Sequence, residues 1–392
     1  MKKHLLLFLI FICSISFSSC KWVKKNNSSS LSLNNDDTGS SLIFSEFHRG
    51  YSTSDRAVEL YNKGDNSLDL SEYKLCIYKQ NETKPHITID LDGLLEAKKT
   101  YVIVYDESDE ALKAKANLIT HDLMVDGSWP LAIVHNEEIM DSLGHIGFHY
   151  DFSVNADIAR KKEFLVGRGI MDDYDWIKYD ADNINLLGTI EVTMSEDELL
   201  LGQKLTAEDF TKPFIKDGVG GGGAIEVSLK YVGDGDTTNF SIPSSIRGEY
   251  LNSTESVRYY GINTPEIQHG TSIDAQPWGT TAKKYNNDVL NNAKKFVLQT
   301  VDGGAFRETY NRLLAFVWYS NSSNPEPEDY TCLNFEMVRE ALAFTYMAKN
   351  TENRYTMFYK DVSYIHIMEN AELRAKNNGW KIHGEKDPNF NY

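Results

Sequence analysis

Short apolar runs, mostly with a period of two residues, recur through residues 41–191 and limit what this part of the chain can fold into. Within residues 41–191 such runs include 57–61, 73–78 and 100–105, and polar clusters such as 62–66 separate them. A strand buried on one face has this period of two, and Asn, Gly and Asp allow the chain to reverse between strands. We therefore expect an antiparallel β-sandwich over residues 41–191.

The N-terminus has the pattern of an export signal. Two lysines precede an apolar run, 5–17, that is too short for an ordinary membrane-spanning helix. Small Ser18 and Ser19 directly before Cys20 resemble a bacterial lipoprotein processing site, although Phe17 departs from the usual aliphatic residue. The resemblance implies that Cys20 is lipidated and holds the protein on the outer face of the cell membrane. A plain secretory signal and an uncleaved anchor are the alternatives.

Composition suggests how the chain is divided. A run of glycines at 220–223 marks a boundary, because glycine restricts the backbone least. The expected segments are a signal peptide at 1–19, a flexible tether at 20–40, the sandwich at 41–191, a linker at 192–223 and a second domain at 224–392. Cys76 and Cys332 then fall in different domains, so both are expected to be core residues and not a disulfide.

The net charge of −17 is distributed unevenly. Residues 225–392 carry a net charge of −4, and residues 1–224 carry −13. This balance argues against tight, salt-stable binding of nucleic acid. It does not argue against catalysis on nucleic acid, which needs only a local positive cleft and a metal ion.

The second domain combines short strands with amphipathic helices. Strands are expected at 224–232, 238–242, 256–262, 295–300 and 313–319, and helices at 277–293, 334–343 and 362–376. Short strands with helices packed at their ends predict an α+β fold built on an OB-type barrel.

Three polar motifs of the second domain point to phosphodiester chemistry. They are Gly233-Asp234-Gly235-Asp236-Thr237, the segment 257–266 with Arg258 and Glu266, and the segment 310–315 with Arg312. Carboxylates supply oxygen ligands for a hard divalent cation and a base for water, and two guanidinium groups offset charge on phosphorus. Asp234 is more simply explained as a turn residue.

Together with Pro277-Trp278-Gly279, the segment 337–343 and Gly379-Trp380, these motifs make residues 225–380 similar to the staphylococcal nuclease, or thermonuclease, family. The resemblance implies a Ca²⁺-dependent nuclease that cleaves DNA and RNA with little sequence preference. It also implies roles for single residues: metal ligation by Asp236, Asn263 and the Thr264 carbonyl, catalysis by Arg258, Glu266 and Arg312, and nucleotide contact by Tyr310.

Asn263 is a departure from the family pattern, because many members have an aspartate there. An amide oxygen can ligate calcium, but the site loses one formal negative charge. This keeps open an alternative from another functional class: a surface protein or adhesin that binds nucleic acid without cleaving it. The tryptophans Trp278, Trp318 and Trp380 are expected to fill the core rather than to stack on bases.

The first domain also resembles a known family. Segments 43–47, 57–62, 70–73 and 141–147 are similar to the lamin-tail domain, an immunoglobulin-like fold found on secreted bacterial nucleases. Within it, Glu46 and Glu59 are expected to be solvent-facing or sheet-edge carboxylates. The combined expectation is a lipid-anchored surface nuclease that degrades nucleic acid for nucleotide scavenging, with an unidentified partner for the lamin-tail domain.

Overall fold

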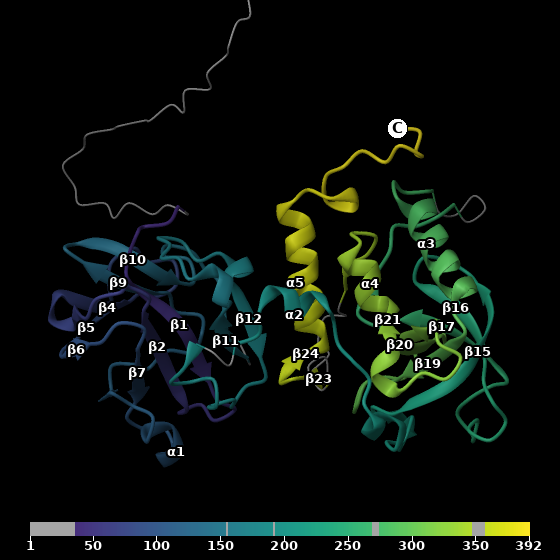
Figure 1. Cartoon of the computed structure of the whole chain (residues 1–392), viewed down its shortest axis with the longest axis horizontal. Helices are drawn as coiled ribbons and strands as arrows, with labels where there is room; N and C mark the ends of the chain where they lie inside the picture. The colour runs from purple at the N-terminus through teal and green to yellow at the C-terminus, as the bar shows by residue number, and fades with distance from the viewer. Residues whose placement is uncertain (1–35, 154–155, 191–192, 269–273, 347–356) are drawn as a thin grey trace, which may run out of the picture. The chain divides into compact units, whose positions relative to one another are not determined.

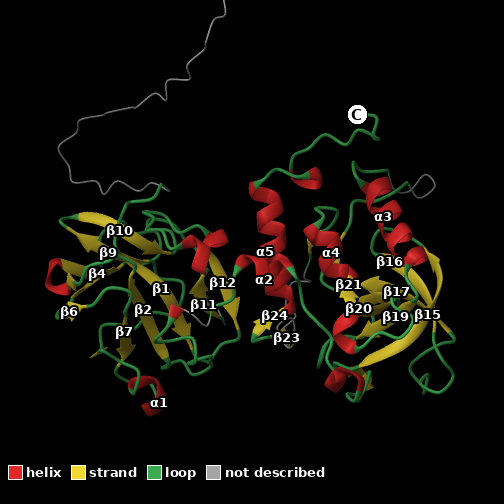
Figure 2. Ribbon diagram, viewed as in Figure 1, coloured by secondary structure: helices red, strands yellow, loops and turns green. Residues whose placement is uncertain are grey.

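The computed structural model describes residues 36–153, 156–190, 193–268, 274–346 and 357–392 (Figures 1 and 2). The signal peptide, Cys20 and most of the expected tether lie outside these ranges. Within them, no helix has the length and the apolar character needed to cross a membrane. The fold is mostly β and contains several sheets.

The first part of the chain forms two sheets that share one core. The larger sheet has the order β23-β24-β12-β11-β1-β2-β7-β8 and the smaller one the order β10-β9-β4-β5. Their strands from this part of the chain are β1 (Leu42–Arg49), β2 (Arg56–Asn62), β4 (Tyr73–Ile77), β5 (Ile87–Asp90), β7 (Thr100–Tyr105), β8 (Leu118–Thr120), β9 (Leu131–His135), β10 (Glu138–Leu143), β11 (Asp157–Arg160) and β12 (Trp176–Tyr179).

Apolar side chains from both sheets meet in the cluster between them. Phe44 and Leu60 come from the larger sheet, and Leu75 and Ile133 come from the smaller one; all four are buried. The expected strands at 57–61, 73–78 and 100–105 are present, although β1 and β2 are buried along nearly their whole length and not on one face alone. Short elements complete this part: α1 (Glu110–Lys113) and the pair β3 (Leu68–Asp69) and β6 (Leu94–Leu95).

Glu46 and Glu59 correct a prediction. They were expected to be sheet-edge or solvent-facing carboxylates, yet both are buried on inner strands of the sheet and stand opposite each other in the β1–β2 register. The backbone N–H of Gly188 donates to Glu59 Oε2 at 2.5 Å, so a loop distant in sequence covers this face of the sheet. Burial, and then the neighbouring Glu59, raise the pKa of Glu46 well above its usual value.

The segment expected to be a linker is folded. It contains α2 (Glu196–Leu200), which Ser195 caps by accepting a hydrogen bond from the backbone of Glu198, and the pair β13 (Ile215–Lys216) and β14 (Val219–Gly220). Leu199, Leu205 and Phe214 are buried in the same core as the second domain.

The glycine run 220–223 is likewise buried, not loose. A Cβ atom on Gly221 would lie 2.2 Å from the carbonyl oxygen of Pro213, and one on Gly223 would lie 2.2 Å from that of Lys212. The absent side chains thus permit two backbone segments to lie against each other. The expectation of an unrestricted linker here was wrong for this physical reason, although the domain boundaries themselves remain predictions.

The second part of the chain is built on one six-stranded sheet in the order β17-β16-β15-β19-β20-β21. The strands are β15 (Ala224–Val232), β16 (Thr237–Ser241), β17 (Thr254–Tyr259), β19 (Lys295–Gln299), β20 (Leu313–Ser320) and β21 (Thr331–Cys332). β17 also pairs in parallel with β20, with Arg258 opposite Leu314. This additional pairing joins the first strand of the sheet to its fifth, so the ladder closes on itself.

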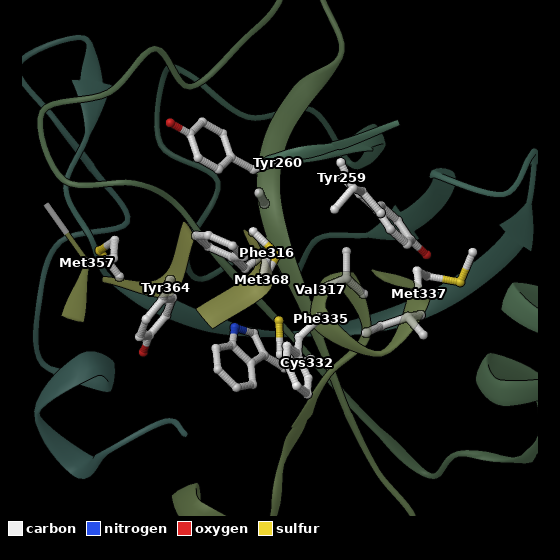
Figure 3. Packing of buried hydrophobic residues seen from close by; sticks show 14 of the residues in the cluster. Tyr259, Tyr260, Phe316, Val317, Cys332, Phe335, Met337, Met357, Tyr364 and Met368 are labelled. Atoms are coloured by element: carbon white, nitrogen blue, oxygen red, sulfur yellow. The ribbon is translucent and has the colours of Figure 1, made fainter. Parts of the chain in front are cut away.

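Three helices accompany this sheet, as the apolar periodicity predicted: α3 (Gly279–Asn292), α4 (Leu333–Arg339) and α5 (Tyr364–Asn377). α5 packs against α4. Figure 3 shows Phe316 of β20 and Tyr364 of α5 side by side in the shared core, with ring centroids 5.4 Å apart. Trp278 and Trp318 are buried and Trp380 is half-buried, and the described cysteines, Cys76 and Cys332, are free and buried.

Two strands of the larger N-terminal sheet come from the far end of the chain. β24 (Val362–Ser363) pairs with β12, with Val362 opposite Tyr179, and β23 (Phe358–Tyr359) extends the pairing. The ring N–H at Nδ1 of His366 donates to the carbonyl oxygen of Lys178 at 2.9 Å. Residues from 159 to 371 accordingly contribute to one continuous apolar core.

Candidate functional site

The turn between β15 and β16 places the carboxylate of Asp236. Gly235 lies so close to the Thr264 side chain that a Cβ atom would be 2.6 Å from Thr264 Oγ1, which explains the glycine at this position. The Thr264 backbone N–H donates to Asp236 Oδ2 at 2.8 Å. Both residues are buried, so the carboxylate is held against the segment that follows β18 (Ile262–Asn263).

Arg258 of β17 lies against the same carboxylate. Its Nη1 is 3.1 Å from Asp236 Oδ2, and its Nη2 donates to the amide oxygen of Asn263 at 2.7 Å. Nη1 also donates to the Ile262 carbonyl at 2.8 Å. One guanidinium therefore joins the predicted metal ligands Asp236 and Asn263, and the planar group suits several oxygen acceptors at once.

Arg312 reaches this group through Thr237. Its Nη1 donates to Thr237 Oγ1 at 3.3 Å, and this hydroxyl lies 3.2 Å from Asp236 Oδ1. Glu308 holds the base of the guanidinium, because Glu308 Oε1 accepts from both the backbone N and the Nε of Arg312, at 3.1 and 3.0 Å. Partial burial acts to raise the pKa of Glu308, but the hydrogen bonds from Arg312 and from the Tyr310 backbone, with the charge of Arg312, lower it on balance.

Glu266 follows Thr264 by two residues on the same segment. Its backbone N–H donates to Gln276 Oε1, and its carbonyl accepts from the Gln276 N–H, both at 2.9 Å. Gly279, at the start of α3, lies against this carbonyl so closely that a Cβ atom would be 2.3 Å from it. The backbone that carries the predicted base is therefore fixed from two sides.

Tyr310 is 81 % exposed, and the Arg312 guanidinium carbon lies 5.7 Å from its ring centroid. The structure thus joins Asp236, Arg258, Asn263 and Thr264 by direct contacts, brings in Arg312 through one hydroxyl, and leaves the Tyr310 ring open to solvent beside Arg312.

Sequence reasoning missed two supporting residues. Asn286 of α3 is buried; its Nδ2 donates to the Asp234 carbonyl at 2.7 Å, and its Oδ1 accepts from the Tyr259 hydroxyl at 2.8 Å. It therefore braces the turn that carries Asp236. Phe344 of β22 (Phe344–Thr345) pairs opposite Asn263 and is partly exposed. Asn286 could have been noticed, because it is a polar residue on the apolar face of a predicted helix. No local sequence pattern distinguished Phe344.

The possible metal ligands around Asp236 are oxygen atoms, the type that a hard divalent cation prefers. The carboxylate of Asp236, the amide oxygen of Asn263 and the Thr264 carbonyl are all oxygen ligands, and Glu266 lies two residues farther along. Among the described residues, no three His, Cys, Asp or Glu side chains gather as a metal cluster. A cation at this site would therefore be bound by neutral oxygen ligands together with only a small number of carboxylates.

Comparison with known families agrees with this geometry. Residues 256–379 match the family model described as staphylococcal nuclease homologue. The match includes Arg258, Glu266 and Arg312, and Asp236 precedes it. A search of curated proteins finds no match to the chain. The C-terminal part of the chain therefore contains a staphylococcal nuclease-type domain, which suggests nuclease activity on nucleic acid.

Proposed function

We propose that the protein is a metal-dependent nuclease that hydrolyses phosphodiester bonds of DNA and RNA with little sequence preference. The observation that carries the proposal is the convergence of two arginines on one buried carboxylate: Arg258 contacts Asp236 directly, and Arg312 contacts it through Thr237. The family match over residues 256–379 supports the same function. The closed strand ladder of the second part supports the OB-type interpretation.

The residues divide the work of in-line hydrolysis. Arg258 and Arg312 donate to phosphoryl oxygens and offset the charge that builds up in the transition state. Glu266 accepts the proton of the attacking water, and Tyr310 contacts the nucleotide. Asp236, Asn263 and Thr264 would hold the cation, calcium by family resemblance, which supplies further positive charge beside the phosphate. The resemblance implies products with a 3′-phosphate.

The proposal extends to the rest of the chain. The two sheets with a common core support a lamin-tail, immunoglobulin-like interpretation of the first part. With lipid on Cys20, the enzyme would act at the outer face of the membrane. There it would break extracellular nucleic acid into fragments small enough for import as nucleotides.

Cleavage of plasmid DNA and of RNA by the full-length protein tests the activity, with Ca²⁺, with Mg²⁺ and with chelator. We expect metal-dependent cleavage that falls at least about 100-fold in Glu266→Gln, because the substitution removes the base but keeps the shape. Glu328→Gln, at an exposed position, is the control for loss of one carboxylate. Asn263→Asp adds a carboxylate to the site and should lower the Ca²⁺ concentration needed.

Two results would contradict the proposal. Cleavage that persists in chelator would remove the metal from the mechanism. Retention of DNA with no cleavage under any metal would favour the alternative, a non-catalytic surface binding protein or adhesin.

A further inference from the structure

The turn that carries Tyr310 and Arg312 is tight and ends where β20 begins. The Asn311 N–H donates to the Glu308 carbonyl at 2.9 Å, and the Glu308 N–H donates to the Arg312 carbonyl at 3.0 Å. Asn311 has a φ of 63°, in the left-handed region. Since Glu308 directs the Arg312 side chain, the position of this turn sets the position of the guanidinium.

Arg307 attaches this turn to the sheet. Its Nη1 and Nη2 donate to the two carboxylate oxygens of Glu255 at 2.9 and 2.8 Å. The same two nitrogens donate to the carbonyls of Asn311 and Tyr250, each at 2.9 Å. The guanidinium is thus shared between a carboxylate of β17 and the backbone of the turn itself.

This ion pair is shielded from water. The side chain of Glu255 is 3 % exposed and that of Arg307 is 16 % exposed. A bidentate arginine–carboxylate pair in such a place has a defined geometry, and removal of one partner leaves a buried charge without compensation. The Glu255 carboxylate also accepts from the backbone N–H of Asn252 at 2.6 Å, which fixes it in turn.

Glu255 and Arg258 belong to the same strand. They are three residues apart on β17, which corresponds to about 10 Å along an extended chain. The Arg307 pair therefore ties the turn of one arginine to the strand of the other. The pairing of Leu313 with Val257 holds the chain after Arg312. Before Arg312, the Phe306 carbonyl accepts from the Leu314 N–H at 2.8 Å, which ties the turn to β20. The Arg307 side chain adds the direct attachment of the turn to β17.

We propose that Glu255 and Arg307 are positioning residues of the nuclease: they set the distance between Arg258 and Arg312 by clamping the 307–312 turn to β17. This inference rests on the proposed function. Neither residue touches the substrate; both act through Arg312. Arg307 belongs to the matched region, whereas its partner Glu255 lies immediately before it.

Steady-state cleavage by the full-length protein separates positioning from mere stability. In Arg307→Met we expect kcat to fall about 10- to 100-fold with KM changed less than about threefold, because misplacement of Arg312 weakens transition-state contacts. Arg307→Lys, which keeps the charge, should recover part of the loss. Arg339→Met is the matched control, since it breaks another ion pair, with Glu336 at 2.8 Å, and should leave kcat unchanged.

A double variant makes the test specific. If Arg307 acts through Arg312, then Arg307→Met combined with Arg312→Met should be no slower than Arg312→Met alone. Multiplicative effects, or a kcat within twofold of wild type in a folded Arg307→Met protein, would overturn the proposal.

Hydrogen–deuterium exchange provides a readout that does not depend on activity. The clamp predicts faster exchange in the 307–312 turn of Arg307→Met, with unchanged exchange in α5. Unchanged exchange in the turn would overturn the clamp. A wild-type protein that cleaves nothing under any metal would refute the proposed function. If the turn of Arg307→Met then still exchanged faster, the clamp would exist but would have no catalytic role, and the inference would also be overturned.

Discussion

The Arg258 guanidinium has acceptors within the site and is also expected to bind a phosphate. Its guanidinium contacts Asp236, Asn263 and the Ile262 carbonyl, which are oxygen acceptors of the site itself. If Asp236 and Asn263 turn toward a cation, Arg258 loses two acceptors and its donors become free for a phosphate. An amide oxygen at Asn263 would bind a cation less strongly than a carboxylate, so this exchange would be easier to reverse.

Lys161 is a second residue whose burial has consequences. It is 1 % exposed, and its Nζ lies 3.9 Å from the ring centroid of Tyr174. Burial lowers the pKa of Lys161 to about 8, although nearby carboxylates such as Glu196 oppose the shift. A lysine with a depressed pKa costs stability while it is charged.

The sign of the pH dependence follows from this shift. Below pH 8 the folded and unfolded chains both carry the proton; between pH 8 and about 10.5 only the unfolded chain keeps it, so stability rises with pH. We predict that Lys161→Met stabilises the protein at pH 7 by about 1 to 3 kcal/mol and removes this rise. Urea unfolding at pH 7 and pH 10 measures both effects. Lys162→Met, at the exposed neighbouring position, is the control. Destabilisation by Lys161→Met would show that the contact of Lys161 with the Tyr174 ring outweighs the cost of burying the charge.

At the scale of elements, the segment 193–223, which connects the two parts of the chain, packs as a piece of the second part. The segment 193–214, which includes α2, buries Met194, Leu199, Leu205 and Phe214 in the core that contains β15 to β20. Burial of side chains of this size stabilises a fold by about 1.5 to 3 kcal/mol each. Four of them together approach the whole stability of a typical domain.

A fragment that begins at Ile225 should therefore not fold as the full chain does. We predict that residues 225–392 lack a cooperative thermal transition, whereas residues 36–392 retain one, because the fragment loses four core side chains and the β12 partner of β24. Circular dichroism during heating measures the difference. A fragment with the melting temperature of the longer protein would show that segment 193–224 contributes little.

Strand and helix periods predicted most elements of the second part, including β15, β19, β20 and α3. The hairpin β23–β24 was not predicted, because strands of two residues are too short to show a period. Pairing with β12, about 180 residues earlier in the chain, is a property of the folded molecule.

At the scale of the whole molecule, the distribution of charge bears on the proposed surface nuclease. Residues 1–224 carry −13 and residues 225–392 carry −4, so the part that holds the site repels a polyanion least. A nuclease tethered to the cell would cleave nucleic acid at the surface, where fragments can be taken up.

Substitution of Cys20 tests the anchor. We predict that Cys20→Ser moves the protein from the membrane fraction to the medium or the soluble fraction, because stable attachment would require the lipid on this residue. Cys76→Ser, at a buried position, controls for the loss of a thiol. Immunoblotting of cell fractions measures the distribution, and membrane retention of Cys20→Ser would favour an uncleaved anchor.

What the sequence by itself determined lies in local patterns. Apolar patterns predicted the longer strands and the three helices of the second part, and the motifs around Asp236, Arg258 and Arg312 indicated the chemistry. Only the tertiary structure decided that Glu46 and Glu59 are buried, that the glycine run packs against Lys212 and Pro213, and that Glu255, Arg307 and Glu308 hold Arg312. The physical reason is common to these cases: each depends on contacts between segments or on turn geometry, and such contacts leave no period in the chain.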